Sequence, residues 1–471
     1  MVDYVVEAES GAVALTPVAK AQLEGWLAGQ PPSVQNWAHA ANFTGEAGAL
    51  CLVPDGEGRL ASVLAGLGDE DDPWVFAQLP GKLPPGLYRL AGSLSPRLAN
   101  WAALGWELAT YVFGRYKVHN GRAWPRLVWP EGADREHVER TAAAIRLVRD
   151  LINTPAADMG PAELAAAAEA LAVRHGAKLR VLVGDEQLAA EYPCIHAVGR
   201  AAAAPRQPRL IDLVWGNEAA PKVTLVGKGV CFDSGGLDIK PSSNMKLMKK
   251  DMGGAAHVLG LAAMVMAARL PVRLRVLIPA VENAVSGDAM RPLDVLNTRK
   301  GITVEVGNTD AEGRLILADA LWEAGRERPD LLVDLATLTG AARSALGTDL
   351  PALFCNDESL AADLLAAGER ENDPMWRLPL FKPYRRMLES KVADLANVSD
   401  SPYAGAITAA LFLQEFVPAG LPWAHFDIMA WNGATRPGRP EGGEALVIRA
   451  LFTVIAQRFT VSAVAGTSSV G

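Results

Sequence analysis

Four acidic residues and two lysines lie in short, glycine-containing stretches around and beyond the middle of the sequence. The stretches read LVGKGVCFDSGGLDIK, MKKDMGGAA and GNTDAEGRL; the acids are Asp233, Asp251, Asp310 and Glu312, and the lysines are Lys228 and Lys240. If these carboxylates meet in one crevice they repel one another, and some stay protonated unless cations neutralise them. Four negative charges match two divalent ions, and carboxylate-bridged ions ~3.5–4 Å apart are an arrangement used for hydrolysis. The pattern therefore predicts an oxygen-rich site for ions such as manganese, magnesium or zinc.

The acids and lysines also have simpler interpretations when each is taken alone. Asp251 fits a helix N-cap and Asp310 fits the start of a helix. Lysines on loops are usually solvated, but near metal ions a lysine can be held neutral and act as a nitrogen ligand. A second, charged lysine could polarise a carbonyl and stabilise an oxyanion. It is the joint occurrence of the six residues that favours a metal centre.

Ser234 lies within Asp-Ser-Gly-Gly, which resembles the surroundings of a serine-protease nucleophile. Such an enzyme needs a histidine within hydrogen-bond reach of the serine, and the sequence nominates none. No HExxH pair occurs, and His257 and His425 lie in apolar segments where a packed core role is expected. We therefore expect Asp233 to be the active group and Ser234 to be a bystander.

The elements that must position these residues alternate along most of the chain. Short apolar strands separated by helices of 15 to 20 residues predict an α/β fold, with two α/β domains joined by a long helix and a catalytic domain built on a doubly wound, mostly parallel sheet flanked by helices. The expected limits are an N-terminal domain at 1–134, a linker helix at 135–155, a catalytic domain at 156–459 and a loose tail at 460–471. Three expected strands, KVTLVG, ITVEVGN and LLVDLATLTG, end beside the candidate residues. Ligands bind beyond the carboxyl ends of strands in such sheets, so these ends should form the crevice.

Composition limits the class of protein. The chain has 471 residues and a formal net charge of −8, which argues against nucleic acid as the main partner. Its four cysteines are too scattered for a disulfide framework or a thiolate zinc site. The first residues lack the features of a signal peptide, and no apolar run approaches the ~18 residues of a spanning helix. A soluble, cytoplasmic protein is expected.

These motifs resemble the leucine aminopeptidase family. NTDAEGRL is its signature octapeptide, and VGKGVCFDSGG with MKKDMGGAA is its other half. The resemblance covers about 151–459, including ENAVSGDAMRPLDVL and ADLANV, and is weak over the N-terminal domain. It implies a cytosolic, hexameric, two-metal enzyme that removes one residue, leucine or another mainly apolar one, from the N-terminus of peptides.

The resemblance also implies residue roles. Asp233 and Glu312 would bridge both ions, Lys228 and Asp251 would complete the tighter site, and Asp310 would complete the exchangeable one. Lys240 would steady the substrate carbonyl, and Arg314 would hold a bicarbonate that acts as general base. The positions that would line the substrate pocket are Met248, Thr337, Leu338 and Gly340.

Three residues depart from the family pattern. Lys250 stands where the family usually has tyrosine, Met429 where it has a small residue, and Asn432 where an apolar one is common. The metal set is complete, which argues against an inactive homologue, but the preference for the first side chain is open. A DNA-binding or regulatory hexamer of the same fold is the alternative, and a nucleotide-binding protein is disfavoured because neither GxxxxGK[ST] nor GxGxxG occurs.

Overall fold

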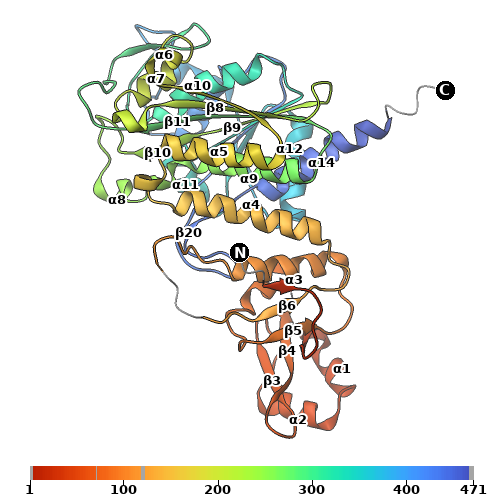
Figure 1. Ribbon diagram of the computed structural model, residues 1–471. Coiled ribbons are helices and arrows are strands. Elements are labelled where there is room, and N and C mark those ends of the chain that lie inside the picture. Colours follow the sequence, from red (N-terminus) through yellow and green to blue (C-terminus); the bar gives the residue numbers. More distant parts are fainter. Residues whose placement is uncertain (1–3, 70–71, 118–121, 466–471) are drawn as a thin grey trace, which may run out of the picture. The chain divides into compact units, whose positions relative to one another are not determined.

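The computed structural model describes residues 4–69, 72–117 and 122–465, and the ribbon is shown in Figure 1. The chain divides into two compact units. Unit 1 contains residues 1–146 and 434–441, and unit 2 contains residues 147–433 and 442–471. The long helix α4 (Arg135–Asn153) therefore begins in unit 1 and ends in unit 2.

Unit 1 is built on one sheet, which has the strand order β1-β6-β5-β2-β4-β3 in the part of the chain that is described. Only its β3–β4 pair is antiparallel. Its strands are β1 (Val5–Val6), β2 (Val13–Ala19), β3 (Leu50–Pro54), β4 (Leu60–Gly68), β5 (Leu87–Leu90) and β6 (Arg126–Val128), and its other helices are α1 (Leu23–Ala28), α2 (Pro32–Ala40) and α3 (Pro96–Ala109). The Ser95 hydroxyl caps the start of α3 by accepting a hydrogen bond from the Leu98 N–H, as serine commonly does at this position.

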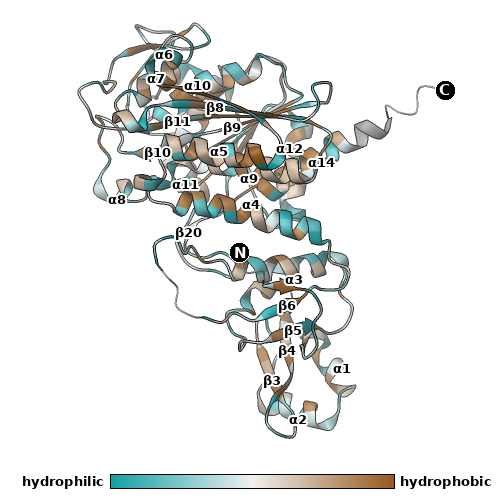
Figure 2. Ribbon diagram, viewed as in Figure 1, coloured by the Kyte–Doolittle hydropathy of each residue, from teal (hydrophilic) through white to brown (hydrophobic). Residues whose placement is uncertain are grey.

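Unit 2 contains the large sheet, with the order β16-β15-β18-β14-β9-β11-β8-β7 and β10 paired to β11. Its strands are β7 (Lys178–Val183), β8 (Arg209–Trp215), β9 (Lys222–Gly227), β10 (Gly229–Asp233), β11 (Arg273–Asn283), β14 (Leu331–Ala336), β15 (Ala352–Cys355), β16 (Trp376–Arg377) and β18 (Trp423–Asp427). The central pairs β14–β9, β9–β11 and β14–β18 are parallel, as expected for a doubly wound fold. Strands β9 and β14 are buried along almost their whole length, and the central strands are coloured as hydrophobic in Figure 2.

Helices cover both faces of this sheet (Figure 1). Helices α5 and α9 contact each other and the sheet, while α10 packs with α7 and contacts β9, β11 and β14. The helices of unit 2 are α5 (Pro161–His175), α6 (Gly184–Leu188), α7 (Pro193–Gly199), α8 (Ser242–Met245), α9 (Gly253–Ala267), α10 (Glu312–Gly325), α11 (Gly340–Leu346), α12 (Glu358–Arg370), α13 (Gly405–Gln414) and α14 (Ile448–Ala465). The expected loose tail, 460–471, is helical as far as 465, and 466–471 lie outside the described residues. The domain limits expected from the sequence stay a prediction.

One expected strand of the large sheet lies elsewhere. The segment ITVEVGN forms β13 (Thr303–Glu305), which pairs with β12 (Val295–Asn297) and β17 (Leu395–Ala396) in a separate small sheet. A further short pair joins β19 (Trp431–Asn432) to β20 (Gly442–Gly443). The loop after β13 still reaches the ends of the large sheet, because α10 follows it and packs against β9 and β14.

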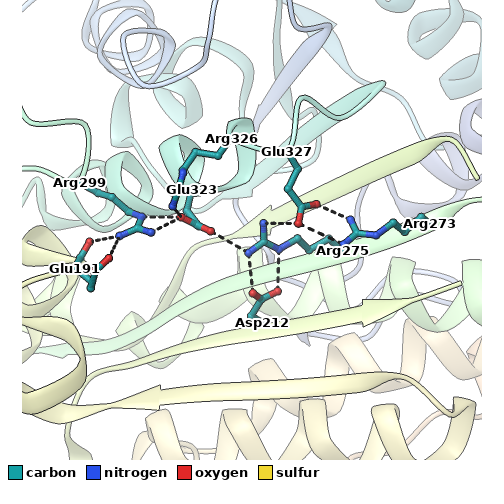
Figure 3. A network of polar contacts seen from close by, with 8 residues as sticks. All are labelled: Glu191, Asp212, Arg273, Arg275, Arg299, Glu323, Arg326 and Glu327. Carbon is teal, nitrogen blue, oxygen red and sulfur yellow. Dashed lines mark hydrogen bonds and ion pairs between the residues drawn. The ribbon is translucent and has the colours of Figure 1, made fainter. Parts of the chain in front are cut away.

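A network of charged side chains ties α10 to the large sheet (Figure 3). Arg275 of β11 pairs with Asp212 of β8 at 2.7 Å and with Glu323 of α10 at 3.2 Å. The other members are Glu191, Arg273, Arg299, Arg326 and Glu327. Since the Arg275 side chain is 7% exposed, these ion pairs are less screened than surface pairs. They help to fix the helix that begins at Glu312.

No helix among the described residues is both long enough and apolar enough to cross a membrane.

Candidate metal centre and active site

The four predicted carboxylates converge at the carboxyl end of the large sheet. Asp233 is the last residue of β10, Asp251 lies in the 3₁₀ turn η5 (Met248–Met252), and Glu312 is the first residue of α10. Oxygen atoms of Asp233, Asp310 and Glu312 lie within 4.8 Å of one another. Asp233, Asp251 and Glu312 are each at most 2% exposed. Residues from three parts of the sequence thus form one acidic cluster.

Each predicted lysine pairs with two of these acids. The Lys228 ammonium nitrogen lies 2.8 Å from Asp251 Oδ2 and 2.9 Å from Glu312 Oε1. The Lys240 ammonium lies 2.8 Å from Asp233 Oδ2 and also pairs with Asp310. The two lysines therefore lie among the acids, as the sequence pattern predicted.

Burial and mutual repulsion disturb the titration of the cluster. Burial, followed by the charge of Asp233, raises the pKa of Glu312 to about 8 and that of Asp310 to about 6. Burial alone would lower the pKa of Lys228, but the charges of Asp251, Glu312 and Asp233 raise it above its ordinary value. Two cations are thus too few to keep every carboxylate ionised, which is the condition that favours uptake of more positive charge.

The oxygen and nitrogen atoms of the cluster are suitable ligands for divalent cations. Glu312 Oε2 is buried and accepts no hydrogen bond from any described residue. A buried carboxylate oxygen without a partner is costly. Oxygen-rich donor sets suit manganese and magnesium, and zinc also accepts carboxylates. Asp233, Asp251, Asp310, Glu312 and the nitrogen of Lys228 are the residues that would hold such ions.

A residue without an assigned role in the sequence analysis positions Asp233. Asn283, the last residue of β11, donates from Nδ2 to Asp233 Oδ1 at 2.9 Å and to the Thr309 carbonyl at 3.1 Å. The Gly235 N–H also donates to Asp233 Oδ1, at 2.9 Å. Gly235 has φ +90°, in the left-handed region that favours glycine, so the chain can turn back over the carboxylate.

The Ser234 hydroxyl is hydrogen-bonded within the same turn. Its hydroxyl donates to the Asn283 carbonyl at 2.8 Å and accepts from the Gly236 N–H at 3.2 Å. The two buried histidines bond elsewhere: His257 Nδ1 lies 2.6 Å from the Gly253 carbonyl oxygen, and His425 Nδ1 lies 2.6 Å from Asp334 Oδ1. No histidine of the described residues hydrogen-bonds Ser234, which agrees with its expected role as a bystander.

Asn397 holds the loop that carries Asp310 and Glu312. Its Oδ1 accepts from the Gly307 N–H at 2.7 Å, and its Nδ2 donates to the Asn308 carbonyl at 2.8 Å. Its own carbonyl accepts from Arg314 Nη1 at 2.6 Å. Asn397 lies in the ADLANV motif and Asn283 in ENAVSGD, so both signals were in the sequence, but an amide between loops gives no pattern that reveals its partner.

Arg314 lies in the first turn of α10 and is 8% exposed. Burial lowers its pKa to about 10. Its Nε is buried and has no hydrogen-bond partner among the described residues. An anion such as the expected bicarbonate would supply that partner.

The acidic cluster opens into a cavity of about 200 Å³. All four predicted substrate-binding residues line it, namely Met248, Thr337, Leu338 and Gly340. Lys228, Asp233, Lys240, Asp251 and Asp310 line it as well, whereas Glu312 and Arg314 do not. Lys250 and Met429, two of the departures from the family pattern, also face this cavity, and burial lowers the pKa of Lys250 to about 8.

A doubly wound sheet with a buried centre of carboxylates and lysines beside a small cavity defines a metal-dependent hydrolase. The sequence matches the catalytic domain of the cytosol aminopeptidase family, Peptidase M17, over residues 146–452, and the M17 aminopeptidase N-terminal domain over 13–130. The chain belongs to the cytosol aminopeptidase family, and it is an aminopeptidase.

Individual relatives agree. A probable cytosol aminopeptidase of Syntrophotalea carbinolica is 43% identical over 75% of this chain and 74% of its own length. One of Leifsonia xyli subsp. xyli is 40% identical over 88% of both chains. The crystal structure of a cytosol aminopeptidase from Coxiella burnetii is 51% identical, with a TM-score of 0.92 over 96% of this chain and 98% of that one. The bottromycin maturation enzyme BotP in complex with Mn is 35% identical, with a TM-score of 0.85 over 95% of this chain and all of that one.

Proposed function

We propose that this aminopeptidase removes leucine and other, mainly apolar, residues from the N-termini of peptides by hydrolysis at a centre of two divalent ions. The observation that carries the proposal is that Asp233, Asp251 and Asp310 line one cavity, while Glu312 lies in the same oxygen cluster with a buried oxygen that accepts no hydrogen bond from the described residues. When bound, two ions, Mn²⁺ or Zn²⁺, would polarise the peptide carbonyl and lower the pKa of the attacking water. The Mn complex of BotP supports the choice of metal.

We base the ligand roles on the resemblance, and the positions of the residues are compatible with them. Asp233, Asp310 and Glu312 form the tight oxygen cluster. The resemblance implies that Asp233 and Glu312 of this cluster would contact both ions. Lys228 and Asp251 would complete the more buried site, and Asp310, whose side chain is 33% exposed, the exchangeable one. Lys228 binds a metal only as a neutral amine, so it would release its proton on metal uptake.

Two cationic side chains would assist the reaction. Lys240 lines the cavity and stays protonated beside Asp233 and Asp310, so its ammonium can donate to the substrate carbonyl oxygen as negative charge develops. Arg314 has a buried Nε free to bind bicarbonate, which would serve as the general base toward water. Asn397 holds Arg314 in place through its carbonyl oxygen.

The cavity would receive the first residue of the peptide. Met248 and Leu338 offer it apolar contacts, and Thr337 and Gly340 lie at the carboxyl end of β14 and the start of α11. The free α-amino group would bind near Asp310, which accounts for the removal of one residue at a time. We also propose a cytoplasmic homohexamer, on the resemblance and on the name cytosol aminopeptidase carried by the relatives. Nothing in the described structure favours the DNA-binding alternative.

The test uses the full chain stripped of metal with a chelator. Leucyl-p-nitroanilide should be hydrolysed only after Mn²⁺ or Zn²⁺ is added back, and the N-acetylated substrate should not be hydrolysed at all. Glu312→Gln should lower kcat/KM by at least about 100-fold while the circular dichroism spectrum is retained, because a ligand shared by both sites is lost. Near-normal activity of Glu312→Gln, or hydrolysis of the blocked substrate without metal, would overturn the proposal.

A further inference from the structure

The lining of the active-site cavity contains a buried lysine that has no partner. Lys250 is 5% exposed and lies in η5 beside Asp251. Its side chain forms neither a hydrogen bond nor an ion pair with any described residue, whereas Lys228 and Lys240 in the same cavity each pair with two carboxylates. Burying an ammonium without a counter-charge is costly, so this position is suited to an anion that enters from the cavity.

Lys249, the neighbouring residue, differs from Lys250 because its ammonium group has partners. The Lys249 ammonium donates to the Asn153 carbonyl at 2.7 Å and lies 5.4 Å from the centre of the Trp431 ring. Lys249 does not line the cavity, and these contacts are enough to account for its partly buried ammonium group. Lys250 has no such explanation.

The acids closest to Lys250 are committed to other groups. Asp251 pairs with Lys228 through Oδ2 and accepts from the Thr337 hydroxyl through Oδ1, at 2.8 Å in both cases. Asp427 accepts from the Leu338 and Thr339 N–H groups at Oδ1 and from the Thr339 hydroxyl at Oδ2. Both carboxylates act on Lys250 through their charge, but neither forms a hydrogen bond or an ion pair with its ammonium group.

A second cation on the same cavity is also without an acid. The Arg343 side chain of α11 contacts the sulfur of Met429 through Nη1 at 4.0 Å, and sulfur is a weak acceptor. Its guanidinium folds back over the start of its helix, since a Cβ at Gly340 would lie 3.6 Å from Nη2. Lys250, Arg343 and Met429 thus line one cavity that is also lined by the candidate metal ligands.

We infer that this cavity binds a carboxylate, that of a glutamate or aspartate side chain at the first position of the peptide, through Lys250 and Arg343. The inference rests on the proposed function and widens its substrate class from apolar to acidic N-terminal residues. A cavity of about 200 Å³ beside the metal ligands accommodates one side chain, and two unpaired cations give a carboxylate an advantage over its neutral isostere. The C-terminal carboxylate of a dipeptide is the other source of the same chemistry, which the test separates.

The test compares isosteric substrates of the metal-loaded enzyme by product release. Glu-Ala-NH₂ should be cleaved with a kcat/KM at least about tenfold above that of Gln-Ala-NH₂, because only the former gains a charge-assisted bond. Lys250→Met should bring this ratio close to one, Lys250→Arg should retain most of it, and the matched control Lys249→Met should leave it unchanged. Arg343 is exposed, so Arg343→Gln tests the same carboxylate even where Lys250→Met does not fold, and it should lower the ratio too.

Several results would overturn the inference. They are a Glu-to-Gln ratio of one or less in the wild type, a ratio untouched by both Lys250→Met and Arg343→Gln, and a preference for Ala-Ala over Ala-Ala-NH₂ with no preference for Glu over Gln. In each case cleavage of Leu-Ala-NH₂ with added metal would leave the proposed function standing. Failure to cleave Leu-Ala-NH₂ under any metal would overturn both.

Discussion

At the scale of single residues, the partner of a side chain rather than its type decides what it can do. Lys228, Lys240 and Lys250 line one cavity, but the first lies between two metal-ligand candidates, the second bridges two others, and the third has no acid. Asn283 is an uncharged example. Its side-chain amide donates both to Asp233 and to the loop that carries Asp310, so its role is set by these two partners. Such a residue acts on chemistry only through the ligand it orients.

Asn283→Ala should therefore weaken metal binding by about tenfold or more, since Asp233 loses the donor that fixes its orientation. Activity should return at high Mn²⁺, because no ligand has been removed. The measurement is a metal titration of the stripped enzyme, followed both by activity and by calorimetry.

Ser234→Ala is the matched control, because Ser234 bonds the same Asn283 through its carbonyl and not through its amide. Its metal affinity and its kcat should stay within about threefold of the wild type, as surface-like hydroxyl losses usually do. A loss of turnover in Ser234→Ala that added metal does not restore would instead support Ser234 as a nucleophile.

At the scale of elements, the sequence predicted the buried strands well and the small sheet poorly. Strands β9 and β14 are continuous apolar runs because both of their faces are covered. The sequence predicts both ends of β9 and the start of β14, but β14 ends four residues before the expected segment does. Strand β13 has only three residues, too few for a periodicity to show which sheet it joins. The ligands were found because acids and glycines cluster along the chain, whereas Asn283 and Asn397 act across 26 to 90 residues and leave no local pattern.

Close packing at the start of α9 gives a second prediction. A Cβ at Gly254 would lie 2.0 Å from the Leu335 carbonyl oxygen and 2.8 Å from the Lys228 nitrogen, and both of those atoms are backbone. Gly254→Ala should therefore destabilise unit 2 by about 2 kcal/mol or more, because neither strand can move away cheaply. At Gly287 nothing lies within 4 Å of such a Cβ, so Gly287→Ala should be close to neutral. Urea unfolding of both variants measures the difference, and equal stabilities would contradict the packing.

His257 links α9 to the start of α14 and makes stability depend on pH. Its Nδ1 lies 2.6 Å from the Gly253 carbonyl oxygen and its Nε2 accepts from the Leu446 N–H at 2.9 Å, so the ring must be neutral with its proton on Nδ1. Burial lowers the pKa of His257 to about 4, from an ordinary value of 6.5. The contribution of His257 to the stability of the fold is present above about pH 6.5 and is lost as the pH falls toward 4. This is because the imidazole binds a proton in the unfolded chain at a pH where the folded ring remains neutral.

Between pH 7.5 and 5.0 this residue should cost unit 2 about 2 kcal/mol of unfolding free energy. His257→Gln should be less stable at pH 7.5 but should lose about that much less over the same interval. His39 is exposed, and His39→Gln should leave the pH dependence unchanged. Parallel pH profiles for wild type and His257→Gln would show that this imidazole does not carry the effect.

At the scale of the whole molecule, every candidate ligand and every substrate-binding residue belongs to unit 2, which contains residues 147–433 and 442–471. Unit 1 has its own sheet and its own buried residues, among them Leu15 of β2 and Leu64 of β4. A ligand stabilises only the part of a protein whose unfolding releases it. Metal binding should therefore distinguish the two units.

Hydrogen exchange of the full chain, stripped and then loaded with Mn²⁺ at about 100 times its dissociation constant, measures this directly. Amides that exchange through unfolding of unit 2, such as Leu225 of β9 and Leu332 of β14, should slow by about 100-fold, since that ratio corresponds to about 2.7 kcal/mol. Amides of β2 and β4 should exchange at an unchanged rate, and Glu312→Gln should abolish the slowing in β9 and β14. Equal slowing in both units would mean that they unfold together. No slowing in either would contradict metal binding at this cluster, because an ion held by buried carboxylates of β10, η5 and α10 cannot remain bound when those elements unfold.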